Sequence, residues 1–354
     1  MASGELALLA RTGEELLNLA RNRAEGDAAT ESAAGWRLLA EQGMARVSLP
    51  GPAGAGEPLR FLGALLRAAG RAAFSVPLID THVGVTLLNA AGFHHGDSED
   101  SACAVGLDPR LLCPSAPAPA RLAVVHPEIA ETVVLAVPDG DAARIDAWRR
   151  ADLSIDPARN IAGDPVAVLE LGALPHPPWS AKVELGVAGH AALVDVLGRS
   201  AMMAGAAERV LEQTLRYVGE REQFGRALAA FQSVQQTAAT MASTVVAASV
   251  AADAALLALE SAAVSDGGPG RADADVAVLA ARLQCSRTAA FVSRAAHQLH
   301  GAIGFTDEHS LGLATTRLTA WRAHGPSHTA VAAQLGRRVF GSGDVWSLVV
   351  GPGT

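Results

Sequence analysis

The stretch Arg221-Glu222-Gln223-Phe224-Gly225 combines a guanidinium group and an aromatic ring beside a glycine. Arginine forms charge-assisted, fork-like hydrogen bonds with anionic groups, and phenylalanine offers an apolar platform to a ligand. Taken alone, Arg221 is explained as a surface charge and Phe224 as a core aromatic residue. The combination indicates a ligand site, because Gly225 interrupts two helical patterns where these side chains would meet a ligand.

A second stretch, residues 298–309, reads Gln-Leu-His-Gly-Ala-Ile-Gly-Phe-Thr-Asp-Glu-His. Gly301 and Gly304 lie at the end of a long predicted helix, where glycine permits close approach of another backbone or a ligand. An ordinary helix C-terminus accounts for the two glycines. It gives no reason for the flanking Gln298 and Phe305, so we treat this stretch as a second candidate contact site.

The elements that must position these residues fall into three regions, which we predict as domains. Residues 1–95 show helical periodicity, with a glycine C-cap at Gly43 and breaks at the following prolines. Residues 96–180 contain short β-branched runs and turn signals, which favour a small antiparallel β domain. Residues 181–354 are almost purely helical and include a stretch from Ala227 to about Val264 without proline or glycine. Long helices joined by short loops are typical of a helical bundle.

Composition narrows the classes of function. Half of the 354 residues are apolar and only 4% are aromatic, which suits packed helices. The net charge of −8 argues against a protein whose partner is nucleic acid. The three cysteines are scattered, so we expect neither a disulfide framework nor a metal site. The N-terminus does not resemble a signal peptide and charges interrupt the apolar runs, so we expect a cytoplasmic protein without membrane insertion.

The paired motifs resemble those of the acyl-CoA dehydrogenase family. Arg-x-Gln-Phe-Gly is followed by Phe231-Gln232, and about 65 residues later comes Gln-x-x-Gly-x-x-Gly-Phe-Thr-x-Glu-His. The helix around Trp36 with Gly43 is similar to the opening of the same family. The resemblance implies a mainly α fold with an N-terminal helical domain, a shortened central β-barrel-like domain and a C-terminal four-helix bundle.

The resemblance also implies FAD bound across a subunit interface. Residues matching Arg221 and Phe224 meet the diphosphate and adenosine portion of a neighbour's flavin, and those matching Gln298 and Gly301 approach the same cofactor from the bundle. Leu228 and Phe231 occupy further contact positions of the family. A pure packing role explains these last two equally well.

Family members remove the α-proton of an acyl-CoA thioester while a hydride leaves the β-carbon for the flavin. The base is normally a glutamate before a Gly-Thr pair, but the matching stretch here is Trp321-Arg322-Ala323-His324-Gly325, without a carboxylate. His324 is one candidate base, and a surface or helix-capping role is its alternative. Asp195 is the other, because some members carry the base on an earlier bundle helix. Its alternative is to cap a helix start.

The central domain departs from the family too, because the segment that holds the flavin ring is not found between Ser98 and Val137. Some bacterial relatives in steroid side-chain breakdown, including actinobacterial ones, are α2β2 assemblies in which one chain supplies the base and ring site. We therefore expect a subunit of a heteromeric dehydrogenase that works with a homologous chain carrying the catalytic glutamate and an electron-accepting flavoprotein. A catalytically silent structural subunit and a flavin-dependent oxygenase are the alternatives.

Overall fold

The computed structural model describes residues 2–24, 27–47, 49, 58–93, 101–264, 270–306 and 310–341. Its N-terminal part is helical, as predicted. The helices are α1 (Ala2–Arg23), α2 (Ala28–Glu41), α3 (Met44–Val47), α4 (Pro58–Arg71) and α5 (Leu78–Ala90). The Asp27 carboxylate caps α2 by accepting from the backbone N–H groups of Ala29 and Thr30. Gly43 follows the end of α2 with a φ of +70°, so the predicted glycine terminus of this helix is confirmed.

Strands occupy the middle of the chain and form two sheets. The strands are β1 (Cys103–Leu107), β2 (Arg121–Val125), β3 (Thr132–Asp139), β4 (Ala142–Arg149), β5 (Ala158–Arg159), β6 (Pro165–Glu170) and β7 (Trp179–Glu184), with 3-10 turns η1 (Pro109–Leu111) and η2 (Arg150–Asp152). The sheet orders are β1-β3-β4-β7 and β2-β6-β5. Among the residues that the structure describes, these sheets do not close into a barrel, which fits a shortened domain. The expectation of purely antiparallel pairing was wrong, because β1 pairs with β3 in parallel. The chain between them must return to the same end before β3 begins.

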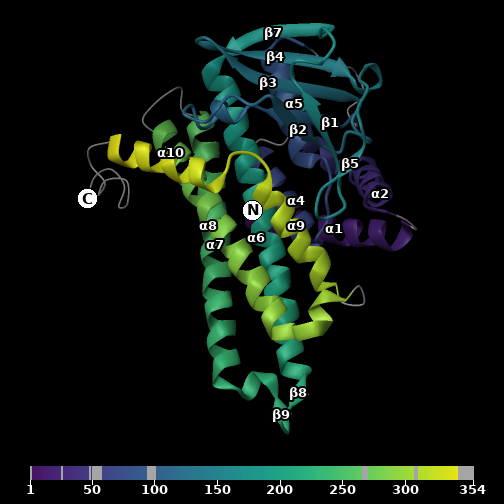
Figure 1. Cartoon of the computed structure of the whole chain (residues 1–354), viewed down its shortest axis with the longest axis vertical. Coiled ribbons are helices and arrows are strands. Elements are labelled where there is room, and N and C mark those ends of the chain that lie inside the picture. The colour runs from purple at the N-terminus through teal and green to yellow at the C-terminus, as the bar shows by residue number, and fades with distance from the viewer. Residues whose placement is uncertain are drawn as a thin grey trace.

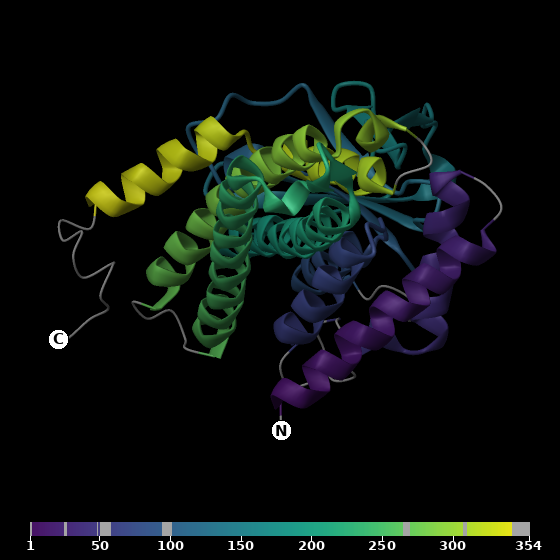
Figure 2. The same ribbon diagram turned by 90° about the horizontal axis from the view of Figure 1, so that it is seen from below.

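Long helices form the C-terminal part, and Figure 1 shows them extending away from the sheets. They are α6 (Leu185–Glu220), α7 (Gln232–Val264), α8 (Gly270–His300), α9 (Leu311–Ala323) and α10 (His328–Gly341). A hairpin of β8 (Glu222–Gln223) and β9 (Arg226–Ala227) and the 3-10 turn η3 (Leu228–Ala230) join α6 to α7, and η4 (Gly301–Phe305) follows α8. Helices α6 to α9 make the predicted bundle, and Figure 2 shows α10 projecting away from it.

The helix predicted from Ala227 begins five residues later, at Gln232. Ala227 pairs with Glu222 across the hairpin instead, and the Leu228 N–H donates to the Arg221 carbonyl at 2.8 Å. Proline and glycine are absent from this stretch, so local propensity favoured helix. The hairpin prevailed because it satisfies these backbone groups while the chain reverses direction.

Helix α7 is long and apolar enough, over Gln232–Ala262, to cross a membrane by length and composition. A core helix of a bundle passes the same test, and α7 packs against both α6 and α8. Only 33% of its most apolar stretch is buried, however. The exposed remainder carries large apolar side chains, including Val246 and Val250 at 60% and 61% exposure. This face is therefore a surface on which another protein could pack.

Candidate functional site

The first motif lies at the tip of the hairpin between α6 and α7, at the far end of the bundle from the sheets (Figure 1). Arg221 is the C-cap residue of α6, and its backbone N–H donates to the Tyr217 carbonyl at 2.8 Å. Its side chain is exposed and has no hydrogen-bond or ion-pair partner within the described part of the chain. The guanidinium is thus available to a ligand or to another subunit.

Phe224 and Gly225 form the two-residue turn of the hairpin. Both have positive φ, +53° and +75°, as a twisted two-residue hairpin turn requires. Glycine adopts this conformation readily, whereas a bulky side chain is strained there. Phe224 is also 89% exposed, so it combines a strained backbone with an apolar side chain in water. Such violations of local preference are typical of functional sites.

The two further contact positions from the first motif lie directly behind this tip. The Phe231 ring packs edge-on against the Phe224 ring at 6.1 Å, and the Arg226 guanidinium lies 4.0 Å from the Phe231 centroid. Leu228 begins η3 and accepts from the Phe231 N–H through its carbonyl. These contacts support the hairpin, so packing accounts for what both residues do within this chain.

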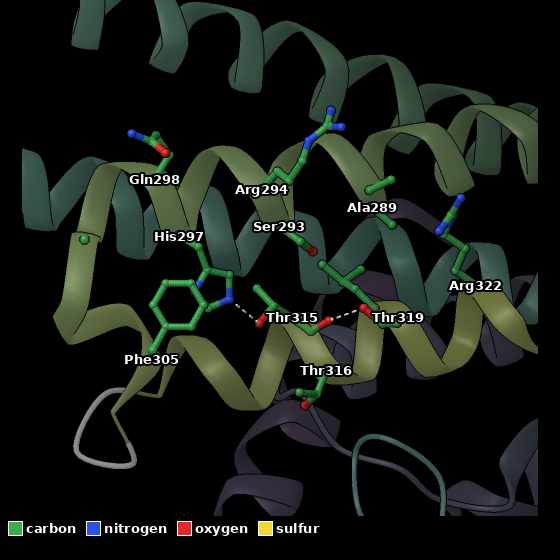
Figure 3. Close-up of a pocket in the computed structure, with 13 residues that line it drawn as sticks. Ala289, Ser293, Arg294, His297, Gln298, Phe305, Thr315, Thr316, Thr319 and Arg322 are labelled. Atoms are coloured by element: carbon green, nitrogen blue, oxygen red, sulfur yellow. Dashed lines mark hydrogen bonds between the residues drawn. The ribbon is translucent and has the colours of Figure 1, made fainter.

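The second motif borders a groove between α8 and α9 of about 810 Å³. Gln298 lies at one end and Arg322 at the other, and Ser293 points from α8 toward α9 between them (Figure 3). Gly301 also lines the groove. Gly301 has a φ of +63°, which lets the chain turn sharply from α8 into η4. Residues 307–309, the later part of the motif, lie outside the described residues.

The groove has the electrostatic character of an anion site. Among the described residues, Arg294 and Arg322 line it, no carboxylate does, and neither guanidinium has an ion-pair partner. His297 approaches Thr315 Oγ1 through Nε2 at 2.9 Å, and Phe305 stacks on its ring at 4.4 Å. Burial lowers the pKa of His297, which favours the neutral ring. The cationic charge therefore belongs to the two arginines, neither of which was singled out in the sequence.

The two candidate bases, Asp195 and His324, meet in a different cavity, of about 230 Å³, between the sheets and the bundle. Asp195 lies in the third turn of α6 and is 6% exposed, so the alternative that it caps the helix start is wrong. His324 is the C-cap residue of α9, as its helix-capping alternative proposed. Its Nε2 lies 3.8 Å from Asp195 Oδ2.

Asp195 is not a free carboxylate, because Arg199 holds it. The Arg199 guanidinium donates through Nε to Asp195 Oδ1 at 3.0 Å and through Nη2 to Asp80 Oδ1 at 2.9 Å. All three side chains are buried. The Asp195 oxygen that Arg199 holds is therefore already engaged in a buried ion pair. Arg199 was missed in the sequence, although its position four residues after Asp195 on one helix was a usable signal. Asp80 was missed because nothing local indicates that residues 119 positions apart would pair.

His324 is held neutral. Burial, with a smaller contribution from the nearby Arg199, lowers the pKa of its imidazole to about 3, and Asp195 opposes the shift. Arg282 fixes the position of this residue by donating to the carbonyls of Trp321, Arg322 and His324. A neutral, weakly basic imidazole can donate a hydrogen bond but is a poor acceptor of a carbon-bound proton.

This neutral imidazole predicts a pH effect on stability. The pKa of His324 lies below its unfolded value of about 6.5, so the folded state loses stability as the pH falls from there toward about 3. His324→Gln is expected to reduce the pH dependence of the free energy of unfolding by about one proton, or about 1.4 kcal/mol per pH unit, between pH 6 and 4. Urea unfolding at several pH values measures this. Equal pH dependence in both proteins would contradict the assignment.

Comparison with known proteins now decides the family. Residues 194–327 match the family described as "Acyl-CoA dehydrogenase, C-terminal domain". The chain is 30% identical over 303 residues to "Acyl-CoA dehydrogenase IpdE2" of Mycobacterium tuberculosis, covering 82% of this chain and 80% of that protein. The chain belongs to the acyl-CoA dehydrogenase family. The resemblance noted from the paired motifs is therefore confirmed.

Solved structures share the fold of this acyl-CoA dehydrogenase family member. The "Tcur3481-Tcur3483 steroid ACAD G363A variant" superimposes with a TM-score of 0.72 at 20% identity, covering 96% of this chain and 98% of that one. The "ChsE4-ChsE5 complex from Mycobacterium tuberculosis" gives a TM-score of 0.69 at 20% identity, covering 94% and 97%. At this identity the likeness shows the fold alone.

The family is one of flavoproteins, usually with FAD, and the chain's two regions differ in how well they suit that cofactor. The hairpin and the groove suit its diphosphate and adenosine half, since they offer unpaired arginines, a glycine turn and about 810 Å³ of space. The cavity at Asp195 does not suit the flavin ring together with a thioester. Its volume of about 230 Å³ lies below that of ordinary ligand pockets, and Asp108 and Asp195 line it.

Proposed function

We propose that this chain is one subunit of a heteromeric acyl-CoA dehydrogenase and supplies half of a flavin site to a homologous partner. The assembly would oxidise an acyl-CoA thioester to the 2,3-enoyl-CoA. The partner would carry the catalytic glutamate and the ring site, and this chain would contribute the hairpin and the Gln298–Gly301 segment. The class of substrate would be a steroid or fatty-acid side chain, in keeping with the steroid enzyme among the structures of the same fold.

The observation that carries this proposal is the hairpin tip. Arg221 has no partner for its charge among the described residues, and Phe224 is 89% exposed on a strained backbone. Phe224 costs free energy in the isolated chain, since its apolar ring is exposed to water and positive φ is unfavourable for phenylalanine. The hydrated Arg221 guanidinium remains available for an anionic group. A cofactor and a second subunit that cover the tip would offset that cost.

The cavity at Asp195 supports a division of labour between two chains. Arg199 forms an ion pair with the Asp195 carboxylate, which stood as a candidate base. Burial keeps the His324 imidazole neutral. We therefore assign neither residue to proton abstraction in this chain, although both stood as candidates in the sequence. The partner's glutamate would take that role.

The exposed face of α7 supports a protein partner. Val246, Val250 and Leu257 are 60%, 61% and 45% exposed and lie at spacings of four and seven residues, so they share one helical stripe. Asp253 is the one charged residue between Val246 and Leu257, and it pairs with Arg67. A bundle helix of a homologous chain could pack against this mainly apolar stripe, on which the one carboxylate is already paired within the chain.

The residues that would hold FAD are Arg221 and Phe224 at the tip and Gln298 and Gly301 at the groove, with Arg294 and Arg322 adding positive charge. When bound, FAD supplies the acceptor for the hydride that leaves the β-carbon. Electrons would pass on to an electron-accepting flavoprotein, and the assembly would act in the cytoplasm. This chain's own residues would bind and orient the diphosphate half.

Replacing Arg221 by alanine tests the proposal. The chain is co-purified with its homologous partner from the native host, the flavin is removed, and FAD is titrated back. Losing one charge-assisted interaction with a diphosphate should weaken FAD binding about 10- to 100-fold. The control is Arg216→Ala, an exposed arginine on the same helix, for which we expect unchanged binding.

Two outcomes would overturn the proposal. One is unchanged FAD affinity in Arg221→Ala. The other is a wild-type chain that, purified alone, holds one FAD and dehydrogenates an acyl-CoA.

Phe224→Asn tests separately whether the Phe224 backbone is strained. It should stabilise the isolated chain by about 1 kcal/mol, because asparagine tolerates positive φ, while weakening FAD binding in the assembly.

A silent structural subunit is a second candidate, and the small cavity and paired Asp195 favour it. That chain would keep the partner folded without touching the cofactor. The same titration separates the two, since a structural subunit predicts that Arg221→Ala binds FAD normally. A flavin-dependent oxygenase is the other alternative. It would consume oxygen on addition of its substrate, whereas a dehydrogenase would show bleaching of the flavin absorbance by an acyl-CoA without oxygen.

A further inference from the structure

We propose that Tyr217 is a positioning residue that fixes the two cofactor-binding segments of this chain relative to one another. The inference rests on the proposed function, because it concerns how Arg221 and the Gln298–Gly301 segment are held for FAD. Neither motif contains Tyr217, and it is the one tyrosine in the sequence. Its role follows from contacts in both directions.

Toward the hairpin, Tyr217 sets where α6 ends. Its carbonyl accepts the backbone N–H of Arg221 at 2.8 Å, and this bond closes the last turn of the helix. The Arg221 carbonyl in turn accepts the Leu228 N–H at 2.8 Å, which closes the hairpin. The position of the Arg221 guanidinium therefore depends on the last turn of α6, in which Tyr217 lies.

On the side of the groove, the Tyr217 side chain contacts the last residue of α8, His300. Its ring stacks on the His300 ring with centroids 4.4 Å apart and planes 18° apart, and its hydroxyl donates to the His300 carbonyl at 3.3 Å. His300 lies between Gln298 and Gly301 and is 3% exposed. One side chain thus connects segments that are about 80 residues apart in the sequence.

His300 couples Tyr217 to the turn at Gly301, because a hydrogen bond within α8 fixes the position of the His300 ring. Its Nδ1 lies 2.8 Å from the Ala296 carbonyl, one turn back along α8, and so donates to it. The chain turns at Gly301 immediately afterwards, with a φ of +63°. A second connection joins α6 to the far side of this turn, where the Gln213 amide donates to Ser310 Oγ at 2.8 Å. The turn is therefore fixed to α6 at both ends.

A fixed separation between the hairpin and the turn after α8 matters for a site in which both elements bind one ligand. Binding groups must stay within about 0.5 Å of their working positions to keep their full contribution. An arginine on a free hairpin and a glycine turn on a separate helix would each lose conformational freedom on binding. The stacked pair fixes their separation before the cofactor arrives.

The experiment compares three variants of the chain in its co-purified assembly, by titrating FAD into flavin-stripped protein. Tyr217→Leu removes the ring and the hydroxyl and is expected to weaken FAD binding about tenfold or more. Tyr217→Phe keeps the stacking and should restore most of the affinity. Val218→Ala is the control, since Val218 is a buried neighbour on α6 whose truncation lowers stability. It should leave FAD affinity unchanged at a comparable loss of thermal stability.

Combining Tyr217→Leu with Arg221→Ala separates positioning from general damage. If Tyr217 acts through Arg221, adding Tyr217→Leu to Arg221→Ala should cost less than about threefold more, well short of the product of the two single effects. Fully multiplicative losses, or an affinity that falls in Val218→Ala as much as in Tyr217→Leu, would overturn the inference. If Arg221→Ala alone has no effect, the proposed function fails first. If Arg221→Ala weakens FAD and Tyr217→Leu does not, the inference alone fails.

Discussion

Gly205→Ala is expected to lower the free energy of unfolding by about 3 kcal/mol or more, although it adds one methyl group. A Cβ atom at Gly205 would lie 2.1 Å from the Arg67 carbonyl oxygen of α4 and 3.0 Å from the Arg71 nitrogen. Gly70 of α4 meets α6 in the same way, 2.1 Å from the Met202 carbonyl oxygen. Backbone atoms cannot rotate aside, so the two helices must separate.

Separating α4 from α6 would disturb the packing between the N-terminal helices and the bundle, because interiors are packed too closely to absorb a shift of this size. Urea unfolding followed by circular dichroism measures the loss. Gly219→Ala is the matched control, since Gly219 lies on the same helix with nothing within 4 Å of its added methyl. That variant should be as stable as the wild type or gain up to about 1 kcal/mol from helix propensity. A loss below 1 kcal/mol in Gly205→Ala would contradict the close approach.

Arg317→Met is expected to cost about 3–5 kcal/mol, because it leaves the buried Asp164 carboxylate without its cationic partner. The Arg317 side chain is 1% exposed and lies 3.3 Å from Asp164 Oδ1 and 3.4 Å from Glu31 Oε2. It also donates to the Ala73 carbonyl. These partners come from the turn between β5 and β6, from α2 and from the end of α4, so one guanidinium joins the sheets and the N-terminal helices to α9.

Chemical unfolding of Arg317→Met and of the double variant Arg317→Met/Asp164→Asn tests whether the lost stability comes from the unpaired Asp164 charge. If the loss arises from an unpaired buried charge, neutralising Asp164 should recover part of it, as a double-mutant cycle detects. Arg121→Met is the control, because the Arg121–Glu170 pair at 2.7 Å is 67% and 53% exposed and should contribute less than about 1 kcal/mol. Equal losses in Arg317→Met and Arg121→Met would refute the argument.

The sequence by itself determined the family and the order of helices, strands and helices. Both follow from signals within one segment, such as helical periodicity, β-branched runs, and glycines beside an arginine and a phenylalanine. It also located the break between the two long helices, since Gly225 interrupts two helical patterns, but it did not indicate that a hairpin forms there. It misplaced the start of α7, because backbone pairing between Glu222 and Ala227 outweighed the helix propensity of an alanine-rich stretch.

Only the tertiary structure decided what Asp195 and His324 can do. In the sequence each was a candidate base, judged by residue type and position. In the fold, Arg199 pairs Asp195 with Asp80, and burial keeps His324 neutral. What a side chain can do depends on which charges and how much water surround it, and the surroundings of Asp195 include Asp80 and His324, both distant in the sequence. Local sequence does not indicate which distant residues surround these two side chains. The Arg221–Gly225 motif could therefore be recognised from its residues, and the state of the candidate bases could not.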